Sequence, residues 1–184
     1  MVSGSKGIFW HVLFATNGKA AKVADYLKTI DIECFFPVHY KERRLRDTER
    51  KRLTLQPLIG NLVFVKSSRE RLAPHLKEIK LRLSIDSDLY YRDLGTREII
   101  VIPEAIMSNF KTVAGGTKKH ITYLSNEEIN FEKGKKVRII GGAFEGVEGT
   151  FLRIKGRQQV VVTLPDVLSV AIAFIPTRFI FPLE

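Results

Sequence analysis

Residues 41–52 form a strongly basic run that is well suited to bind a ligand through charge. Seven of these twelve residues, K-E-R-R-L-R-D-T-E-R-K-R, are Lys or Arg and three are Asp or Glu, and no apolar periodicity would bury them. Arg and Lys side chains can follow a phosphate backbone without reading its bases. The run predicts a solvated β-hairpin arm that turns near residues 47–48, either a plain surface loop or a phosphate-contacting arm.

A glycine-rich segment is the second candidate for binding. Residues 141–149, G-G-A-F-E-G-V-E-G, include four glycines between the apolar segments 137–140 and 151–154, which predicts two strands joined by a tightly folded loop. A phosphate-binding loop would continue as Gly-Lys-Ser/Thr, but Val147 follows Gly146. Phe144 is the one large apolar side chain in the loop, and it is either a docking anchor for a partner or a plug for the end of the sheet.

Residues with catalytic or metal-binding chemistry are scattered. The four histidines, His11, His39, His75 and His120, have neither cysteine pairs nor closely spaced carboxylates beside them, and Cys34 is the single cysteine. Nothing in the sequence has the spacing of metal ligands or of a nucleophile with its base. We therefore expect a protein that is not an enzyme and binds no metal or cofactor.

The composition favours a charged partner. The formal net charge is +10, from 30 basic and 20 acidic residues, which suits a polyanion or an acidic protein surface, although a basic protein can also simply be soluble. No apolar run reaches the roughly 20 residues that span a bilayer, and the first seven residues do not resemble a secretory signal. We expect a cytoplasmic monomer without a membrane segment.

Apolar patterning predicts the elements that position these groups. Residues 8–14 are apolar on both faces and predict a central strand, and helical spacing after Lys19 predicts an amphipathic helix on that strand. Residues 33–40 predict a second strand, at a sheet edge or with a bulge because of Pro37. Residues 62–65 predict a buried strand.

The middle of the chain predicts a helix after Ser67, which Pro74 delays or kinks. Alternating apolar residues at 81–85 then predict a half-buried strand, and residues 89–102 predict a hairpin. A helix beginning at Pro103 follows. The fold class is α+β, with an N-terminal domain over 8–113, a flexible linker over 114–128 and a small β-barrel over 129–184.

Four motifs together resemble the NusG family of transcription elongation factors. F-W-H-V-L-F, E-C-F-F-P and P-L-I-G-N-L-V-F-V are similar to that family's NGN domain, an α/β sandwich with an antiparallel sheet. The segment 133–155 resembles the KOW motif of small SH3-like barrels, with Gly146 at the most constrained glycine. The basic run and I-P-E-A-I-M-S-N-F-K-T-V resemble the specialised RfaH and UpxY types.

The resemblance implies a factor that bridges the RNA polymerase cleft, suppresses pausing or termination and recruits a partner through its KOW domain. The polymerase-binding patch for the clamp helices would be Phe14, Leu58 and Ile59, although Ile59 and Leu62 stand where the family has aromatic residues. The positions implied or predicted to contact the non-template DNA strand are Lys19, Lys22, Arg43, Arg44, Arg46, Arg50, Lys51 and Arg52. Phe144 and Gly146 would bind the KOW partner, Rho or a small-subunit ribosomal protein.

An RNA-binding ribosomal or assembly protein with a KOW barrel is the alternative function. Such a protein would interleave aromatic residues with its basic ones, because aromatic rings stack on bases. The run at 41–52 has no aromatic residue, which favours backbone contact together with protein docking.

Overall fold

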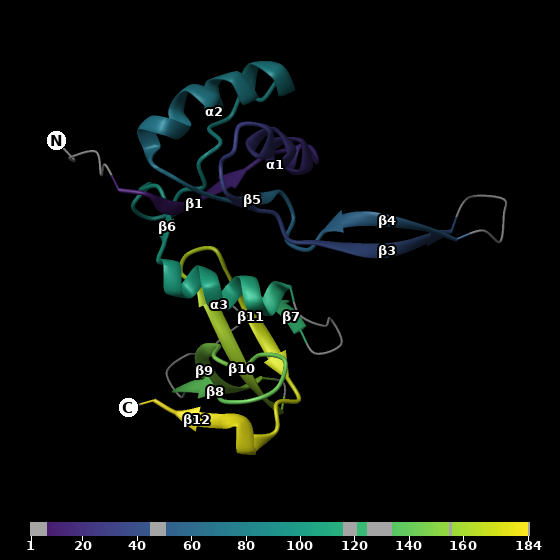
Figure 1. Ribbon diagram of the computed structural model, residues 1–184, viewed down its shortest axis with the longest axis vertical. Helices are drawn as coiled ribbons and strands as arrows, with labels where there is room; N and C mark the ends of the chain where they lie inside the picture. The colour runs from purple at the N-terminus through teal and green to yellow at the C-terminus, as the bar shows by residue number, and fades with distance from the viewer. Residues whose placement is uncertain (1–6, 45–50, 116–120, 125–133, 155, 184) are drawn as a thin grey trace. The chain divides into compact units, whose positions relative to one another are not determined.

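The computed structural model describes residues 7–44, 51–115, 121–124, 134–154 and 156–183, with the backbone alone at 39–44 and 51–55. The described residues form three α-helices and antiparallel sheets, so the predicted α+β class is confirmed. The chain divides into two compact units, Met1–Val101 and Ile102–Glu184. Figure 1 labels the elements of both units.

The N-terminal unit is built on a four-stranded sheet with the order β2-β5-β1-β6. Strand β1 (Phe9–Phe14) lies between β5 (Leu62–Ser67) and β6 (Val101–Ile102), while β2 (Cys34–Phe35) is at an edge. Strands β1 and β5 pair antiparallel from Phe9–Ser67 to Phe14–Leu62. The central position predicted for the first strand is therefore confirmed.

Helices α1 (Ala20–Thr29) and α2 (Arg69–Leu83) lie on the same side of this sheet (Figure 1). Their apolar stripes pack against the sheet residues Leu13, Val63 and Val65 in one buried cluster. The core of this unit thus follows the helical spacing in the sequence.

The strand predicted at 81–85 is wrong. Helix α2 continues to Leu83, and the next residue, Ser84, ends it in a left-handed conformation with φ 50°. Leucines two positions apart fit a strand, but the buried residues Leu72, Leu76 and Ile79 set a helical period that carries on through this stretch, and Leu81 is exposed. Pro74 lies inside α2, which begins at Arg69 rather than after the proline.

The predicted strand 33–40 is interrupted at Pro37. Edge strand β2 ends at Phe35, and β3 (Val38–Arg44) pairs instead with β4 (Lys51–Pro57) in a separate two-stranded sheet. This hairpin extends away from the four-stranded sheet (Figure 1). The antiparallel arm is confirmed by its register, and its predicted turn at 47–48 lies outside the described residues.

The hairpin predicted at 89–102 is reduced to isolated bridges. Tyr90 pairs with Leu13 of β1, and Arg92 pairs with Ile99. The turn between them is held by Asp93, whose Oδ1 accepts hydrogen bonds from the amides of Gly95 (3.0 Å) and Thr96 (2.6 Å). The segment after α2 is thereby tied to the central strand.

The C-terminal unit is a six-stranded antiparallel sheet with the order β12-β8-β9-β10-β11-β7. Its strands are β7 (Ile121–Leu124), β8 (Lys135–Ile139), β9 (Glu148–Ile154), β10 (Arg157–Leu164), β11 (Leu168–Ala173) and β12 (Ile180–Pro182). A short 3-10 helix, η3 (Thr177–Phe179), precedes β12. Helix α3 (Glu104–Ala114) packs on β10 and β11, with Met107, Phe110 and Val113 buried (Figure 1).

The stretch predicted as a linker, 114–128, contains a strand. Within it, β7 pairs with β11 from Ile121–Ile172 to Leu124–Ser169. Helix α3, predicted as the end of the N-terminal domain, groups with the C-terminal unit. The functional domain boundaries at 113 and 129 stay a prediction.

Candidate functional site

The predicted polymerase-binding residues come from two segments that the backbone joins. Phe14 ends β1 opposite Leu62, whose amide donates to the carbonyl of Ile59 at 3.3 Å. Nearby, the amide of Leu58 donates to the carbonyl of Pro37 at 2.8 Å. Phe14, Leu58 and Ile59, which we call the apolar patch, are each half-buried. The end of β1 and the turn before β5 therefore adjoin, as a common binding surface requires.

Tyr91 belongs beside this patch, and the sequence did not point to it. Its ring centroid lies 6.2 Å from that of Phe14, with an angle of 44° between the planes. The Tyr91 amide donates to the carbonyl of Val12 at 2.8 Å, and the Phe14 amide donates to the carbonyl of Leu89 at 2.7 Å. The predicted strand at 89–92 was the available signal, but no pattern indicated that it would lie along β1.

The two lysines of the first helix have different surroundings. The Lys19 ammonium donates to the carbonyl of Ser84 at 3.0 Å, so this lysine joins the start of α1 to the end of α2. Lys22 lies one turn further on and is exposed. Of the two, Lys22 is the better placed for an external anion.

The hairpin register concentrates positive charge. Arg43 is opposite Arg52, and Arg44 is opposite Lys51. Like charges at directly opposed positions of an antiparallel pair are destabilising, and a bound polyanion relieves this repulsion. The strands thus bring four of the predicted nucleic-acid-binding residues together, while Arg46 and Arg50 lie outside the described residues.

The glycine-rich loop is folded around a buried ring. Phe144 is 9% exposed, and its carbonyl accepts a hydrogen bond from the Val147 amide at 3.1 Å. Gly146 has φ 85°, and its amide donates to the carbonyl of Ile139 at 2.7 Å. The left-handed conformation explains the glycine. Burial of Phe144 agrees with the plug alternative, and its role as a docking anchor stays a prediction.

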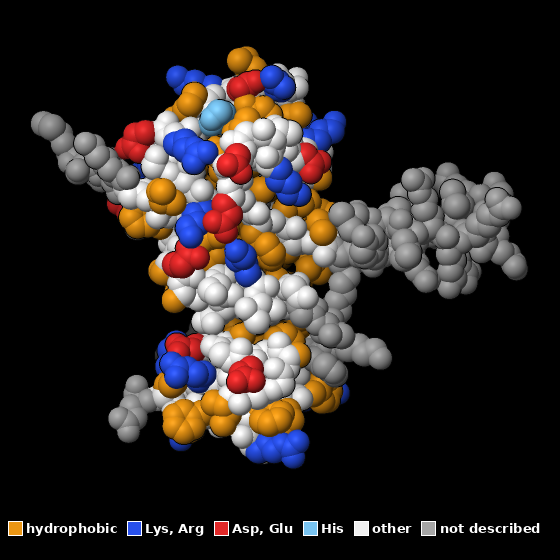
Figure 2. All heavy atoms as spheres, viewed as in Figure 1, with side chains coloured by type: hydrophobic (Ala, Val, Ile, Leu, Met, Phe, Trp, Pro, Cys, Tyr) orange, Lys and Arg blue, Asp and Glu red, His pale blue; other side chains and the backbone are white. Residues whose placement is uncertain are grey.

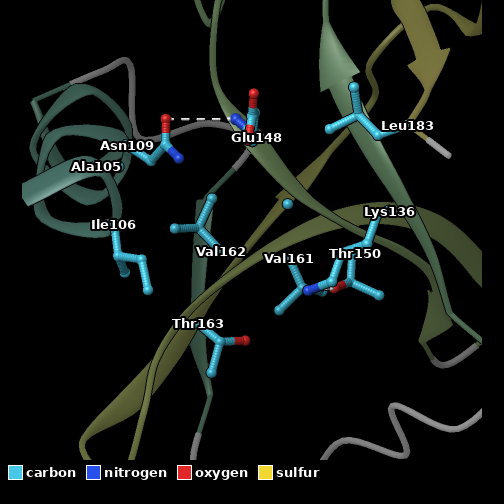
Figure 3. Close-up of a pocket in the computed structure, with 11 residues that line it drawn as sticks. Ala105, Ile106, Asn109, Lys136, Glu148, Thr150, Val161, Val162, Thr163 and Leu183 are labelled. Atoms are coloured by element: carbon cyan, nitrogen blue, oxygen red, sulfur yellow. Dashed lines mark hydrogen bonds between the residues drawn. The ribbon is translucent and has the colours of Figure 1, made fainter. Parts of the chain in front are cut away.

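A cavity of about 360 Å³ lies in the C-terminal unit between α3 and strands β8 to β10 (Figure 3). It opens where the pairing of β9 with β10 ends, at Thr150–Val161. The side-chain oxygen of Asn109 on α3 accepts a hydrogen bond from the Glu148 amide at 3.4 Å, and the Lys136 ammonium donates to the Thr150 hydroxyl at 3.2 Å. The first contact fastens α3 to β9, and the second joins the paired strands β8 and β9.

Burial governs the electrostatics of the central strand. His11 is 1% exposed, and its ring meets that of Tyr90 edge-on at 5.7 Å. Burial, and after it the positive charge of Arg69, lowers the pKa of His11 below its usual 6.5. The imidazole is therefore held neutral within the core.

Two features are absent from the residues that the structure describes. No group of three or more His, Cys, Asp or Glu side chains is arranged to hold a metal ion. In the same part of the chain, no helix combines the length and apolar character needed to cross a membrane.

Comparison with known proteins identifies one family. The family model described as transcription termination factor NusG matches residues 9–131. The match begins with β1 and runs through both N-terminal helices, the basic hairpin, α3 and β7. No curated protein sequence matches the chain.

Proposed function

Because the chain belongs to the NusG family of transcription termination factors, we propose that it binds RNA polymerase across the cleft as an elongation or antitermination factor. The observation that carries this proposal is the family match from residue 9 to residue 131, which covers every residue of the apolar patch. In this proposal residues 8–113 are the NGN domain, and the patch contacts the clamp helices. The factor acts in the cytoplasm as a monomer, by binding rather than by catalysis.

The apolar patch supports the proposal physically. Half-buried apolar side chains keep part of their surface in water, and a partner that covers them gains roughly 25 cal/mol for each Å² removed from solvent. The Phe14–Tyr91 ring pair adds aromatic area, the side-chain class that most often anchors interfaces. The patch therefore offers a compact anchor on a rigid sheet end.

The basic hairpin supports a specialised role of the RfaH or UpxY type. In this proposal Lys22 and the hairpin residues contact the exposed non-template DNA strand once the patch is seated. Each phosphate contact to a single strand contributes only about 0.7 to the salt slope, so a few contacts bind weakly in free solution. Tethering on the polymerase raises the effective DNA concentration and makes weak contacts count.

Residues 129–184 are proposed as the KOW domain that recruits a second protein, such as Rho or a small-subunit ribosomal protein. The support is the glycine-rich loop between β8 and β9 and the antiparallel sheet that continues from it. Phe144 and Gly146 shape this loop, and the exposed Ile140 at its start adds apolar surface.

The test is a charge placed in the apolar patch. Ile59→Asp should abolish binding of the full-length chain to purified RNA polymerase while the thermal transition stays near that of the wild type. Leu94→Asp is the matched control, because Leu94 is 84% exposed in the same unit and lies outside the patch. If Ile59→Asp binds like the control, the proposed polymerase contact is wrong.

Binding of structured RNA in the absence of polymerase distinguishes the alternative function, an RNA-binding ribosomal or assembly protein, from the proposed one. A ribosomal or assembly protein would bind structured RNA tightly without polymerase, and the Ile59→Asp chain would keep that activity.

A further inference from the structure

Three phenylalanines lie within residues 174–181 of the C-terminal unit, a short segment that the proposed function does not use. Phe174 and Phe181 are 66% and 55% exposed, and Phe179 between them is half-buried. The segment runs from the end of β11 through η3 to β12. Over η3 and β12, hydrophobic side chains and Lys or Arg side chains lie next to one another on the surface (Figure 2).

Two of these rings form a cation–π contact with an arginine. The guanidinium of Arg157 lies 5.7 Å from the centre of the Phe174 ring, and that of Arg178 lies 5.0 Å from the centre of the Phe179 ring. Neither guanidinium forms an ion pair with any residue that the structure describes. A guanidinium stacked on a ring still presents N–H groups at its edge, which suit the oxygens of a phosphate.

The backbone at Phe174 is unusual for an aromatic residue. Its φ is 61°, in the left-handed region that glycine and asparagine adopt most easily. Such a conformation persists where the surroundings fix it, and it often marks a functional position. Here it directs the chain out of β11 and leaves a large ring exposed beside Arg157.

Phe179 and Phe181 are held by backbone pairing and by packing against neighbouring residues. The carbonyl of Phe179 accepts a hydrogen bond from the Ile140 amide at 2.8 Å, and the Phe179 ring packs so closely on Gly141 that a Cβ there would lie 2.8 Å from it. Phe181 is paired with Arg138 across β12 and β8. The side chain of Arg138 is already paired with Glu148, so we do not include it in the site.

We propose that Phe174, Phe179 and Phe181, together with Arg157 and Arg178, form a binding surface for single-stranded nucleic acid. In this proposal bases stack on the exposed rings while the two guanidinium groups hold phosphates. Stacking on aromatic side chains and arginine is the way proteins hold unpaired strands with little sequence preference. We call these five residues the stacking surface.

Local charge favours a polyanion over a protein partner. Residues 174–183 contain no acidic residue, and residues 153–158, R-I-K-G-R-Q, contain three basic residues and no acidic one. The basic run at 41–52 has the charge but no aromatic residue, so the two sites differ in chemistry: the run suits backbone contact, and the stacking surface suits unpaired bases. The inference goes beyond the proposed function, which gives DNA contact to the N-terminal unit.

The experiment measures fluorescence anisotropy of labelled U12 RNA, dT12 DNA and a 12-base-pair duplex with the full-length chain over a range of NaCl concentrations. Phe174→Ala/Phe181→Ala should weaken binding of at least one single strand tenfold or more, since one stacked base is worth about 1–3 kcal/mol and 1.4 kcal/mol is tenfold. The salt slope of this variant should stay unchanged, because no phosphate contact is removed. The single strand, RNA or DNA, whose affinity falls more is the one that the stacking surface binds preferentially.

Further variants distinguish the contribution of the guanidinium charges to binding from that of the aromatic rings. Arg157→Gln/Arg178→Gln should lower the salt slope by about 1.4, from two contacts of about 0.7 each. Phe174→Tyr/Phe181→Tyr keeps both rings and should bind like the wild type. The matched control is Leu81→Ala/Leu94→Ala, which removes two exposed apolar side chains of the N-terminal unit and should change nothing.

The basic hairpin must not account for the measured binding, so each variant is repeated in a chain with Arg43, Arg44, Arg50 and Arg52 changed to Gln.

Ultraviolet crosslinking to 4-thiouridine RNA, or 4-thiothymidine DNA, should label the tryptic peptides 158–178 and 179–184, which contain the three rings. Wild-type affinity of Phe174→Ala/Phe181→Ala for both single strands overturns the proposal, and so does crosslinking confined to residues before 102. Polymerase is absent from these assays, so a failed polymerase contact leaves their outcome unaffected.

Discussion

The Phe14 ring lies 6.2 Å from the Tyr91 ring, although Tyr91 follows Phe14 by 77 positions in the chain. The contact follows from backbone pairing, because the Tyr91 amide donates to Val12 and the Phe14 amide donates to Leu89. A segment without regular secondary structure thus adds an aromatic residue to the end of the central strand, next to the apolar patch.

We expect Tyr91→Ala to weaken polymerase binding, and to do so through Phe14. Aromatic pairs are worth about 0.5–1.5 kcal/mol beyond the area that they bury. A double-mutant cycle of Phe14→Ala and Tyr91→Ala, read as polymerase affinity, should therefore show a coupling energy of that size. Phe9→Ala removes a partly exposed ring at the other end of the same strand and should leave the affinity unchanged. Strict additivity of the two variants would contradict a shared site.

His11 should make the stability of the N-terminal unit depend on pH. Its folded pKa is lowered by burial and by Arg69, so the unfolded chain binds a proton more readily. The stabilisation is fully present above the unfolded pKa of about 6.5 and is lost as the pH falls from there toward the folded pKa, with a slope of up to about 1.4 kcal/mol per pH unit.

Urea unfolding at pH 8.0, 6.5 and 5.5 measures this dependence. The wild-type midpoint should fall between pH 6.5 and 5.5, and His11→Leu, which has a similar volume and no titrating group, should reduce that fall. An equal fall in both chains would show that other groups cause the acid sensitivity.

The sequence predicted those elements that neighbouring residues specify and missed those that depend on contacts distant in the chain. Local periodicity identified the strand at 9–14, helix α1 and helix α3, and the dense charge of residues 41–52 indicated the basic hairpin, because each is specified by neighbouring residues. It failed where the decisive contact is distant: β7 is a strand because it pairs with β11, and polar residues on either side made the stretch look like a linker. At 81–85 the leucine spacing fitted both periods, and only packing of α2 on the sheet decides between them.

The candidate sites divide in the same way. The patch residues and the charged hairpin could be named from motifs, because their types and order are local. Tyr91 could not, since its place depends on a bridge to β1, and the burial of Phe144 depends on how the loop folds back on β8.

Phe144→Ala should chiefly reduce stability. Removing a buried aromatic side chain costs about 3–5 kcal/mol, so the C-terminal unit should unfold at a lower denaturant concentration. Phe144→Leu fills more of the space and should recover a large part of the loss. If Phe144→Ala instead kept the wild-type transition and lost only a recruited partner, the ring would be a docking anchor, which is the other alternative that the sequence left open.

The basic hairpin should act inside the elongation complex. Changing Arg43, Arg44, Arg50 and Arg52 together to Gln removes three residues of the opposed basic pairs, together with Arg50 of the same basic run. The local attraction for the non-template strand is lost with them. Pause suppression on a defined template should fall, and the difference from the wild type should shrink as NaCl rises, because salt already screens the wild-type contacts. Affinity for DNA-free polymerase should change little, since the apolar patch is intact.

The matched control is Arg82→Gln/Arg97→Gln, which removes two arginines of the same unit outside the hairpin. Equal loss of pause suppression in the control would show that net charge alone matters, and loss of binding to DNA-free polymerase would place the hairpin in the polymerase contact itself.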